Sequence, residues 1–398
     1  MSEWVEKRLE DMIQINHSNI SENKYNGTIQ YVDISSVDRG RLLGYTEYKY
    51  SEAPGRARRK IKPGDTIFST VRPNLRAYWY VKDCPENAIV STGFAVIRAK
   101  GEYNNRFIYY LLTENSFVNY LALVAKGSNY PAVDTNDFKN AKVTVPDSPT
   151  QNRIASILST YDDAIENNNR RIALLEKAAR ELYQEWFVRL RFPGHESVRF
   201  VNGLSEGWEI KRLDEYCHIT DGTHDTPQQT EYGIPLVTGS CINSGFIDFN
   251  STYFISEADH MSIKRRSGLD SGDILFSNIG TVGNSCIVNY DREFSVKNVI
   301  IFKPKTIEKT AYLYYLLTSP IMQDIFTAQT SGASQQFVGL TFMRRFKILV
   351  PNKQLIDKFA QLVVPILNEK QTLNSKSQNL ARQRDLLLPR LMSGKLEV

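Results

Sequence analysis

One motif near the start of the chain returns about two hundred residues later, and its surroundings return with it. PGDTIFST occupies residues 63–70, and SGDILFSN occupies residues 271–278. A similar spacing, between 204 and 208 residues, separates further matched pairs: Trp4 and Trp208, FIYYLLT at 107–113 and YLYYLLT at 312–318, Val145 and Val350. Repeats of this length indicate a duplicated structural unit. We therefore predict two similar halves.

Each half has two parts of different character. In residues 1–148, β-type runs alternate with Gly, Asn, Asp and Pro, whereas the segment from Pro149 to Arg189 is rich in Ala, Leu, Glu, Arg and Gln. A chain of 398 residues also exceeds one ordinary core. We predict an α+β fold with two globular domains on β-sheet cores and two long helices. The first domain is expected at residues 1–148 and the central helix at 149–190. A linker and the second domain are expected at 191–350, and the C-terminal helix and tail at 351–398.

The central segment has the spacing of a helix with one apolar seam. Its seam residues alternate steps of four and three, and the polar Asn168 is of the kind that fixes register in a coiled coil. Ser148 is the expected N-cap of this helix. The seam comprises Ile154, Leu158, Tyr161, Ile165, Asn168, Ile172, Leu175, Ala179, Leu182 and Trp186.

The C-terminal segment repeats this seam with more polar positions. It comprises Phe359, Val363, Ile366, Lys370, Leu373, Ser377, Leu380, Arg384, Leu387 and Leu391, and Pro365 should kink the helix. The most economical partner for each helix is the other one, which gives an antiparallel coiled coil and a pseudo-twofold between the halves. A homodimeric coiled coil is the alternative.

Positive charge gathers at one equivalent place in both halves, just before the repeated motif. A net charge of +5 is only mildly basic, so the clusters carry more information than the total. A charge run is usually a solvated face, but its repetition favours contacts with DNA phosphates. The two runs comprise Arg56, Arg58, Arg59 and Lys60 in the first half and Lys264, Arg265 and Arg266 in the second.

Polar side chains on expected loops are the candidates for reading DNA bases. Arg, Asn and Gln can make paired hydrogen bonds to base edges in the major groove. Asp221-Gly222 indicates a turn, and DNA contact by the residues after it is the sharper hypothesis. The candidates are Arg72, Asn74, Arg76, Lys126, Ser128, Asn129 and Tyr130 in the first half and Thr223, His224, Asn278, Ser334, Gln335 and Gln336 in the second.

Several classes of protein are disfavoured by what the sequence lacks. It has no GxxxxGK[ST] phosphate loop, no GxGxxG motif after a strand, and no CxxC pair among its four cysteines. The spacing of Cys217, His218 and His224 fits no standard zinc site, so no metal is expected. The charged N-terminal residues do not resemble a secretory signal, and no apolar run reaches membrane-helix length. We expect a cytoplasmic protein.

One enzymatic alternative stays open, a magnesium-dependent nuclease. Asp33 or Asp38 together with Glu47-Tyr48-Lys49 would supply two carboxylates and a lysine. The Glu-x-Lys pattern is frequent by chance, however, and this set has no counterpart in the second half.

Taken together, the motifs resemble those of the specificity subunits of type I restriction–modification systems, over essentially the whole chain. The resemblance rests on the Trp-containing start of each half, the Gly-Asp-x-[IL]-Phe-Ser motif, Gln151-Asn152-Arg153-Ile154-Ala155, Trp186-Phe187-Val188, Arg191-Phe192-Pro193-Gly194-His195-Glu196 and Leu387-Leu388-Pro389-Arg390-Leu391-Met392-Ser393-Gly394-Lys395.

The resemblance implies that each globular part is a target recognition domain that reads one half of a bipartite sequence in double-stranded DNA. The helices would set the spacer between the half-sites, and the chain would be non-catalytic and bind no cofactor. Two methyltransferase subunits carrying S-adenosylmethionine would dock on it, and restriction subunits using ATP and Mg could join. A duplicated protein-binding adaptor is the competing interpretation from another class.

Overall fold

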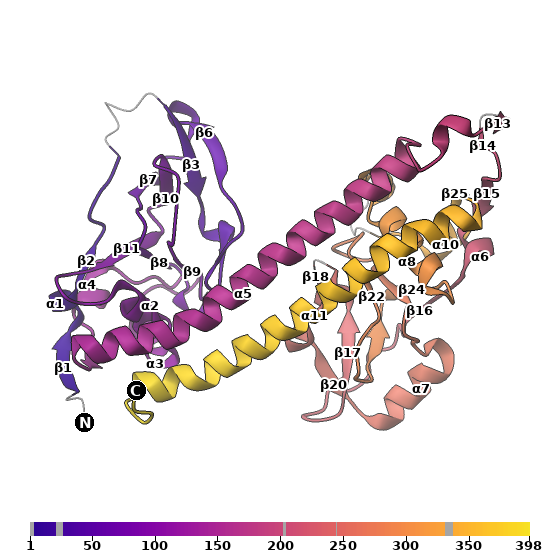
Figure 1. The fold of residues 1–398 in the computed structure, drawn as a ribbon. Helices are drawn as coiled ribbons and strands as arrows, with labels where there is room; N and C mark the ends of the chain where they lie inside the picture. Colours follow the sequence, from indigo (N-terminus) through magenta and orange to yellow (C-terminus); the bar gives the residue numbers. More distant parts are fainter. Residues whose placement is uncertain (1–3, 21–26, 202–203, 244, 331–336) are drawn as a thin grey trace. The chain divides into compact units, whose positions relative to one another are not determined.

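The computed structural model describes residues 4–20, 27–201, 204–243, 245–330 and 337–398, and it divides into two compact units (Figure 1). Unit 1 comprises Met1–Asn167 with Ser377–Val398, and unit 2 comprises Asn168–Lys376. The division falls within the long helices α5 (Ser148–Tyr183) and α11 (Lys353–Met392). Each unit therefore contains a part of both helices.

Unit 1 builds its core from two small sheets and a group of short helices. One sheet has the strand order β2-β11-β8-β9, and the other has the order β6-β3-β10-β7. Its elements are β1 (Val5–Arg8), α1 (Leu9–Met12), β2 (Ile13–Ile15), β3 (Thr28–Val32), β4 (Val37–Asp38), β5 (Arg41–Leu42), β6 (Thr46–Lys49), β7 (Ala57–Lys60), β8 (Thr66–Ser69), β9 (Tyr78–Tyr80), β10 (Ala88–Ser91), β11 (Phe94–Ala99), α2 (Asn105–Thr113), α3 (Asn115–Val124), α4 (Thr135–Lys139) and β12 (Lys142–Val145).

Unit 2 repeats this order of elements. They are β13 (Phe200–Val201), β14 (Leu204–Ser205), β15 (Glu209–Arg212), α6 (Leu213–Tyr216), β16 (His218–Asp221), β17 (Ile234–Thr238), β18 (Ile242–Asn243), β19 (Phe246–Ile247), β20 (Tyr253–Ile255), α7 (Glu257–Ser267), β21 (Ile274–Ser277), β22 (Ser285–Ile287), β23 (Ser295–Lys297), β24 (Val299–Lys303), α8 (Ile307–Leu317), α9 (Pro320–Thr330), α10 (Leu340–Arg345) and β25 (Lys347–Val350).

The strand orders confirm the predicted α+β fold and its duplication. The order β16-β24-β21-β22 matches β2-β11-β8-β9 strand for strand, and β20-β17-β23 matches β6-β3-β10. The central pairs β3–β10 and β17–β23 are both parallel. The units differ at one edge of this sheet, where unit 1 has the strand β7 and unit 2 has the helix α7, and unit 2 also has the additional pair β13–β14 before β15.

The repeated motif forms the same buried turn and strand in both units. Asp65 accepts a hydrogen bond from the amide of Lys62 at 2.7 Å, and Asp273 accepts one from the amide of Asp270 at 2.9 Å. Both carboxylates are buried, and Arg98 and Lys303 respectively form ion pairs with them. The motif therefore stabilises the scaffold, since its polar residues are used inside it.

The N-cap of helix α5 lies one residue earlier than predicted. The carboxylate of Asp147 accepts the amide of Thr150 at 3.0 Å, whereas the Ser148 hydroxyl donates to the carbonyl of Glu102. Asp147 and not Ser148 is thus the N-cap, and the hydrogen bonds with Thr150 hold the pKa of Asp147 below its ordinary value. In α11, Asn352 caps the first turn, and the helix continues through the exposed Pro365.

The predicted seams form the packed faces of the two helices. All ten seam positions of the central segment are buried or half-buried, and so are all ten of the C-terminal segment. Within each unit the side-chain contacts join α5 to α11 of the same chain in antiparallel order: Asp162 meets Arg384 in unit 1, and Glu176 meets Lys370 in unit 2. These contacts occupy the seam without a second copy of the chain.

The two cationic seam positions, Arg384 and Lys370, are stabilised by carboxylates from α5. In unit 1, Arg384 donates to Asp162 at 2.6 Å, and the Tyr110 hydroxyl of α2 donates to the same carboxylate at 2.5 Å. Asp162 and Asp385 raise the pKa of Arg384 although burial alone would lower it.

Unit 2 contains the corresponding arrangement, with Lys370 and the Tyr315 hydroxyl of α8 both donating to Glu176. Lys370 is only 4% exposed. Burial alone would raise the pKa of Glu176, but Lys370 and Arg180 outweigh it and hold this pKa below its ordinary value.

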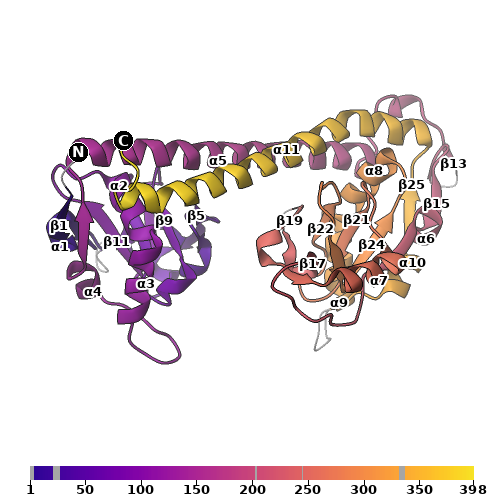
Figure 2. The same cartoon turned by 90° about the horizontal axis from the view of Figure 1, so that it is seen from below.

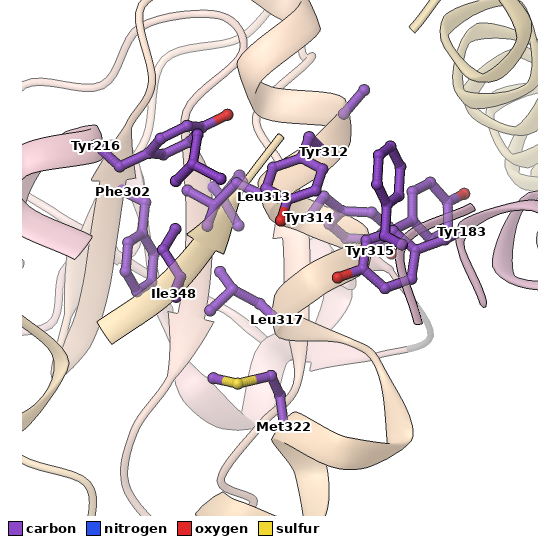
Figure 3. Close-up of a cluster of buried hydrophobic side chains, with 14 of the residues drawn as sticks. Tyr183, Tyr216, Phe302, Tyr312, Leu313, Tyr314, Tyr315, Leu317, Met322 and Ile348 are labelled. Atoms are coloured by element: carbon purple, nitrogen blue, oxygen red, sulfur yellow. The ribbon is translucent and has the colours of Figure 1, made fainter. Parts of the chain in front are cut away.

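Aromatic side chains join helix α5 to the core of unit 2. Tyr183 of α5 packs against Tyr312 of α8 with ring centroids 6.0 Å apart, and Tyr315 and Leu317 continue the same cluster (Figure 3). Within the described residues, no helix combines the length and apolar character that crossing a membrane requires.

Candidate nucleic-acid interface

Two loops of unit 1 that are distant in sequence lie side by side. Val71 and Lys126 each pair with Ala132 in antiparallel bridges, and the Arg72 amide donates to the carbonyl of Pro131 at 2.7 Å. The loop from α3 to α4 projects on the side of the unit away from α5 (Figure 2). The fold thus brings together the candidates from residues 72–76 and 126–130.

The candidates of the α3–α4 loop are all exposed. They are Lys126, Ser128, Asn129 and Tyr130. The Arg72 guanidinium donates to the carbonyl of Asn129 at 2.9 Å and lies 4.5 Å from the ring centroid of Tyr130. Arg72 therefore positions this loop, and the loop's own side chains remain accessible.

Residues 72–76, here called the arginine-framed turn, have an unusual backbone. Arg72 and Arg76 both have left-handed conformations, with φ of 49° and 61°. This conformation costs a residue with a Cβ about 1–2 kcal/mol. The Arg76 guanidinium donates to Asn115 at 2.6 Å, so both framing arginines stabilise the turn. Asn74 is exposed between them.

A third left-handed arginine, which the sequence analysis missed, adjoins this turn. Arg39 has a φ of 39°, and its amide donates to the carbonyl of Arg76 at 3.2 Å. It lies at the tip of the β4–β5 hairpin and is exposed. The only signal in the sequence was Gly40, because two-residue hairpin turns often have glycine at their second position.

The basic run of unit 1 is the edge strand β7, where alternate residues point in opposite directions. Arg56 precedes the strand and is exposed, and Lys60 is half-buried. Arg58 donates to the hydroxyl of Tyr50 at 2.6 Å. Arg59 instead donates to the carbonyl of Phe94, and burial lowers its pKa. The four cations therefore do not form one uniform basic surface.

The basic run of unit 2 lies in the last turn of helix α7. Arg265 is exposed, and Lys264 forms an ion pair with Glu293. Arg266 donates to the carboxylate of Asp221 at 2.9 Å and to the carbonyl of Gly222 at 3.1 Å. Equivalent runs thus have different secondary structures in the two units.

Arg266 belongs to a polar network that also contains His224. The two ring nitrogens of His224 lie 2.8 Å from Asp221 and 2.9 Å from the Oδ1 atom of Asn298. These hydrogen bonds raise the pKa of His224, and the one with Asn298 has the larger effect. Thr223 is buried and accepts the amide of Asp225, so His224 is the accessible member of that pair of candidates.

Asn278 does not lie on the surface. It is 5% exposed, its side chain donates to the carbonyl of Val338 at 3.3 Å, and its own carbonyl accepts the amide of Val338. Asn278 therefore connects two loops of unit 2, as Val71 and Ala132 do in unit 1. Ser334, Gln335 and Gln336 lie outside the described residues.

The residues of the nuclease alternative have structural partners. Asp33 accepts the amide of Ile34 at 2.8 Å, and Glu47 accepts the side chain of Gln30 at 2.7 Å on the neighbouring strand. In the described part of the chain, no group of three or more His, Cys, Asp or Glu side chains has an arrangement suited to a metal ion.

Comparison with known proteins gives one consistent result. The family model for the type I restriction modification DNA specificity domain matches residues 1–177 and 205–377. A specificity subunit of the type I restriction enzyme MjaIX from Methanocaldococcus jannaschii is 27% identical over 351 residues, which are 85% of this chain and 79% of the relative. The HindI specificity subunit from Haemophilus influenzae is 23% identical over 100% of both chains.

A solved structure shares the fold. The crystal structure of the S subunit of a type I restriction-modification system from M. genitalium matches 98% of this chain and 96% of its own, with a TM-score of 0.59 and 17% identity. At this identity the match concerns the fold alone.

Proposed function

The chain belongs to the family of type I restriction modification DNA specificity domains, and we propose that it is the subunit that reads a bipartite DNA target and directs adenine methylation and restriction by its partners. It is a non-catalytic member of that assembly. Unit 1 reads one half-site and unit 2 reads the other.

One observation carries this proposal: the same strand order in both units supports exposed loops of different composition. Unit 1 presents Asn74 and residues 126–130 from two adjoining loops, whereas the accessible candidate beside β16 in unit 2 is His224. A protein that reads two different short sequences needs this combination, because base choice depends on loop side chains placed by a rigid scaffold.

The partners follow from the proposal. Two methyltransferase subunits bind this chain together with double-stranded DNA, and restriction subunits join the same complex in the cytoplasm. S-adenosylmethionine is bound by the methyltransferase subunits, and ATP and Mg are used by the restriction subunits. No step of either reaction uses a side chain of this chain.

The test is to co-express the chain with the methyltransferase subunit encoded beside it and to map methylated adenines across the host DNA. We expect a split motif with a constant spacer. Replacing residues 1–148 by the equivalent domain of a relative should change one half of the motif only. An assembled complex that produces no new methylation would favour the adaptor interpretation instead.

A further inference from the structure

The arginine-framed turn has a counterpart in unit 2 that differs in one informative way. Counting from β8 and β21, Arg72 corresponds to Gly280, and counting back from β9 and β22, Arg76 corresponds to Gly283. Both glycines also have positive φ, 74° and 100°. Unit 1 therefore keeps arginine at two positions where the shared backbone favours glycine.

The extra side chains of unit 1 make the turn rigid. Arg72 connects it to the α3–α4 loop through Asn129 and Tyr130, and Arg76 connects it to Asn115 at the start of α3. The amides of Leu75 and Arg76 donate to the carbonyls of Arg72 and Pro73 within the turn. With both guanidinium groups engaged, they are not the groups that the turn presents to a ligand.

The tip of the turn presents one amide and one apolar side chain. Pro73 is buried, Asn74 is exposed, and Leu75 is 58% exposed. The turn of unit 1 holds three residues between its left-handed positions, whereas that of unit 2 holds two, Thr281 and Val282. In unit 2 the tip ends at Gly283, which is buried and whose carbonyl accepts a hydrogen bond from Gln323. An exposed leucine at this place is thus particular to unit 1.

We propose that Leu75 is a specificity-determining residue of unit 1 and contacts the 5-methyl group of a thymine in the major groove, with Asn74 beside it on the neighbouring base edge. The inference rests on the proposed function. The thymine methyl is the apolar group that base edges offer in that groove, and the Asn side chain pairs best with adenine. A turn that is already held in place loses less conformational entropy on docking.

The test uses the full chain in complex with its methyltransferase subunits. Leu75→Ala should relax one A·T position of one half-site in the methylation map and leave the other half-site unchanged. The matched control is Leu43→Ala, because Leu43 is 60% exposed in the same unit but lies outside the turn. This control should leave both half-sites unchanged.

Binding to duplexes containing deoxyuridine then identifies the contact. In the wild-type complex, replacing one thymine of the affected half-site by deoxyuridine should weaken binding about fourfold, the effect of losing one buried methyl group. The Leu75→Ala complex should bind both duplexes equally. Retained sensitivity to deoxyuridine in Leu75→Ala, or no sensitive thymine in the wild type, would overturn this inference and leave the proposed function standing. A wild-type complex that methylates no split site would overturn both.

Discussion

The two units use one scaffold for different surfaces, and the comparison separates what supports the fold from what is free to change. The strand orders, the buried aspartates of the repeated motif and the Tyr–carboxylate–cation contacts to the long helices recur in both. The edge element differs, β7 in one unit and α7 in the other, and so does the turn that follows β8 or β21. The two units are most alike in their cores and differ most in their loops, as expected of two domains that read different sequences.

In both ion pairs between the long helices, the carboxylate lies on α5 and the cation lies on α11. Both Asp162 and Glu176 belong to α5, and both Arg384 and Lys370 belong to α11. In α5 the positions equivalent to Arg384 and Lys370, 205 residues earlier in the chain, are Ala179 and Ile165. If a second α5 replaced α11, Asp162 would therefore face Ala179 and Glu176 would face Ile165. Unpaired buried charges are costly, so α5 matches α11 better than a second α5.

The largest expected effect comes from breaking the buried pair of unit 2. Glu176→Gln leaves Lys370 charged, buried and without its carboxylate, and it should lower the free energy of unfolding by about 3–5 kcal/mol. Asp162→Asn in unit 1 should cost less, because the Arg384 side chain is 28% exposed and keeps Asp385 as a partner. Urea denaturation of each variant measures both values.

The control for these variants is Arg171→Gln, which removes an exposed ion pair with Glu369 on the same two helices. Such pairs contribute about 0–1 kcal/mol. Equal losses for Glu176→Gln and Arg171→Gln would show that burial of Lys370 does not determine the strength of the pair.

The second effect concerns the arginine-framed turn. Arg72→Gly together with Arg76→Gly gives unit 1 the residues that unit 2 has at these positions. The free energy of unfolding should stay within about 1 kcal/mol of the wild type, because relief of the left-handed backbone offsets the lost contacts. Affinity for DNA carrying the split target should nevertheless fall about tenfold, since the loop of residues 126–130 loses its support and must be ordered on binding.

Gly283→Ala makes the reciprocal comparison in unit 2. A Cβ at this position would lie 2.3 Å from the Gln323 side chain on a backbone with φ of 100°. This variant should lower the melting temperature more than Arg76→Ala in unit 1, which introduces no close contact and removes one exposed hydrogen bond to Asn115. If both variants melt alike, the close contact with Gln323 does not require glycine at position 283.

The smallest effect is a pH dependence expected in unit 2. The folded state raises the pKa of His224 above its ordinary value of 6.5. The stabilisation from protonated His224 is therefore complete below that value and is lost as the pH rises through the folded-state pKa. The protonated ring adds a second positive charge beside Arg266 at the surface. As the pH rises and this charge is lost, DNA affinity should fall about two- to threefold at constant ionic strength.

His224→Gln should abolish that pH dependence. The charged and polar groups around the ring are Asp221, Arg266 and Asn298, with Lys297 and Asp225 nearby in the chain. Among these side chains, only a histidine has an ordinary pKa near 6.5. A pH profile that is identical in wild type and His224→Gln would assign the dependence to another group.

The duplication, the α+β class and the pairing of the long helices could be predicted from the sequence. These features depend on local and periodic information: a repeated motif at constant spacing, β-type runs, and apolar steps of four and three that place one face of a helix in a core. The polar seam residues could be identified in the same way, although not the carboxylates that stabilise them.

Which of the candidate residues are accessible depends instead on contacts that form in the folded chain. Arg58 and Arg59 are neighbours in sequence, yet Arg58 contacts Tyr50 whereas Arg59 donates to Phe94, 35 residues away. Asn278 is buried by Val338, and Arg72 is engaged by Asn129. Leu75 gave no signal in the sequence, because its exposure depends on a turn whose backbone is stabilised by side chains from other loops. Such long-range contacts are absent from any local pattern, and they determine which side chains a ligand can reach.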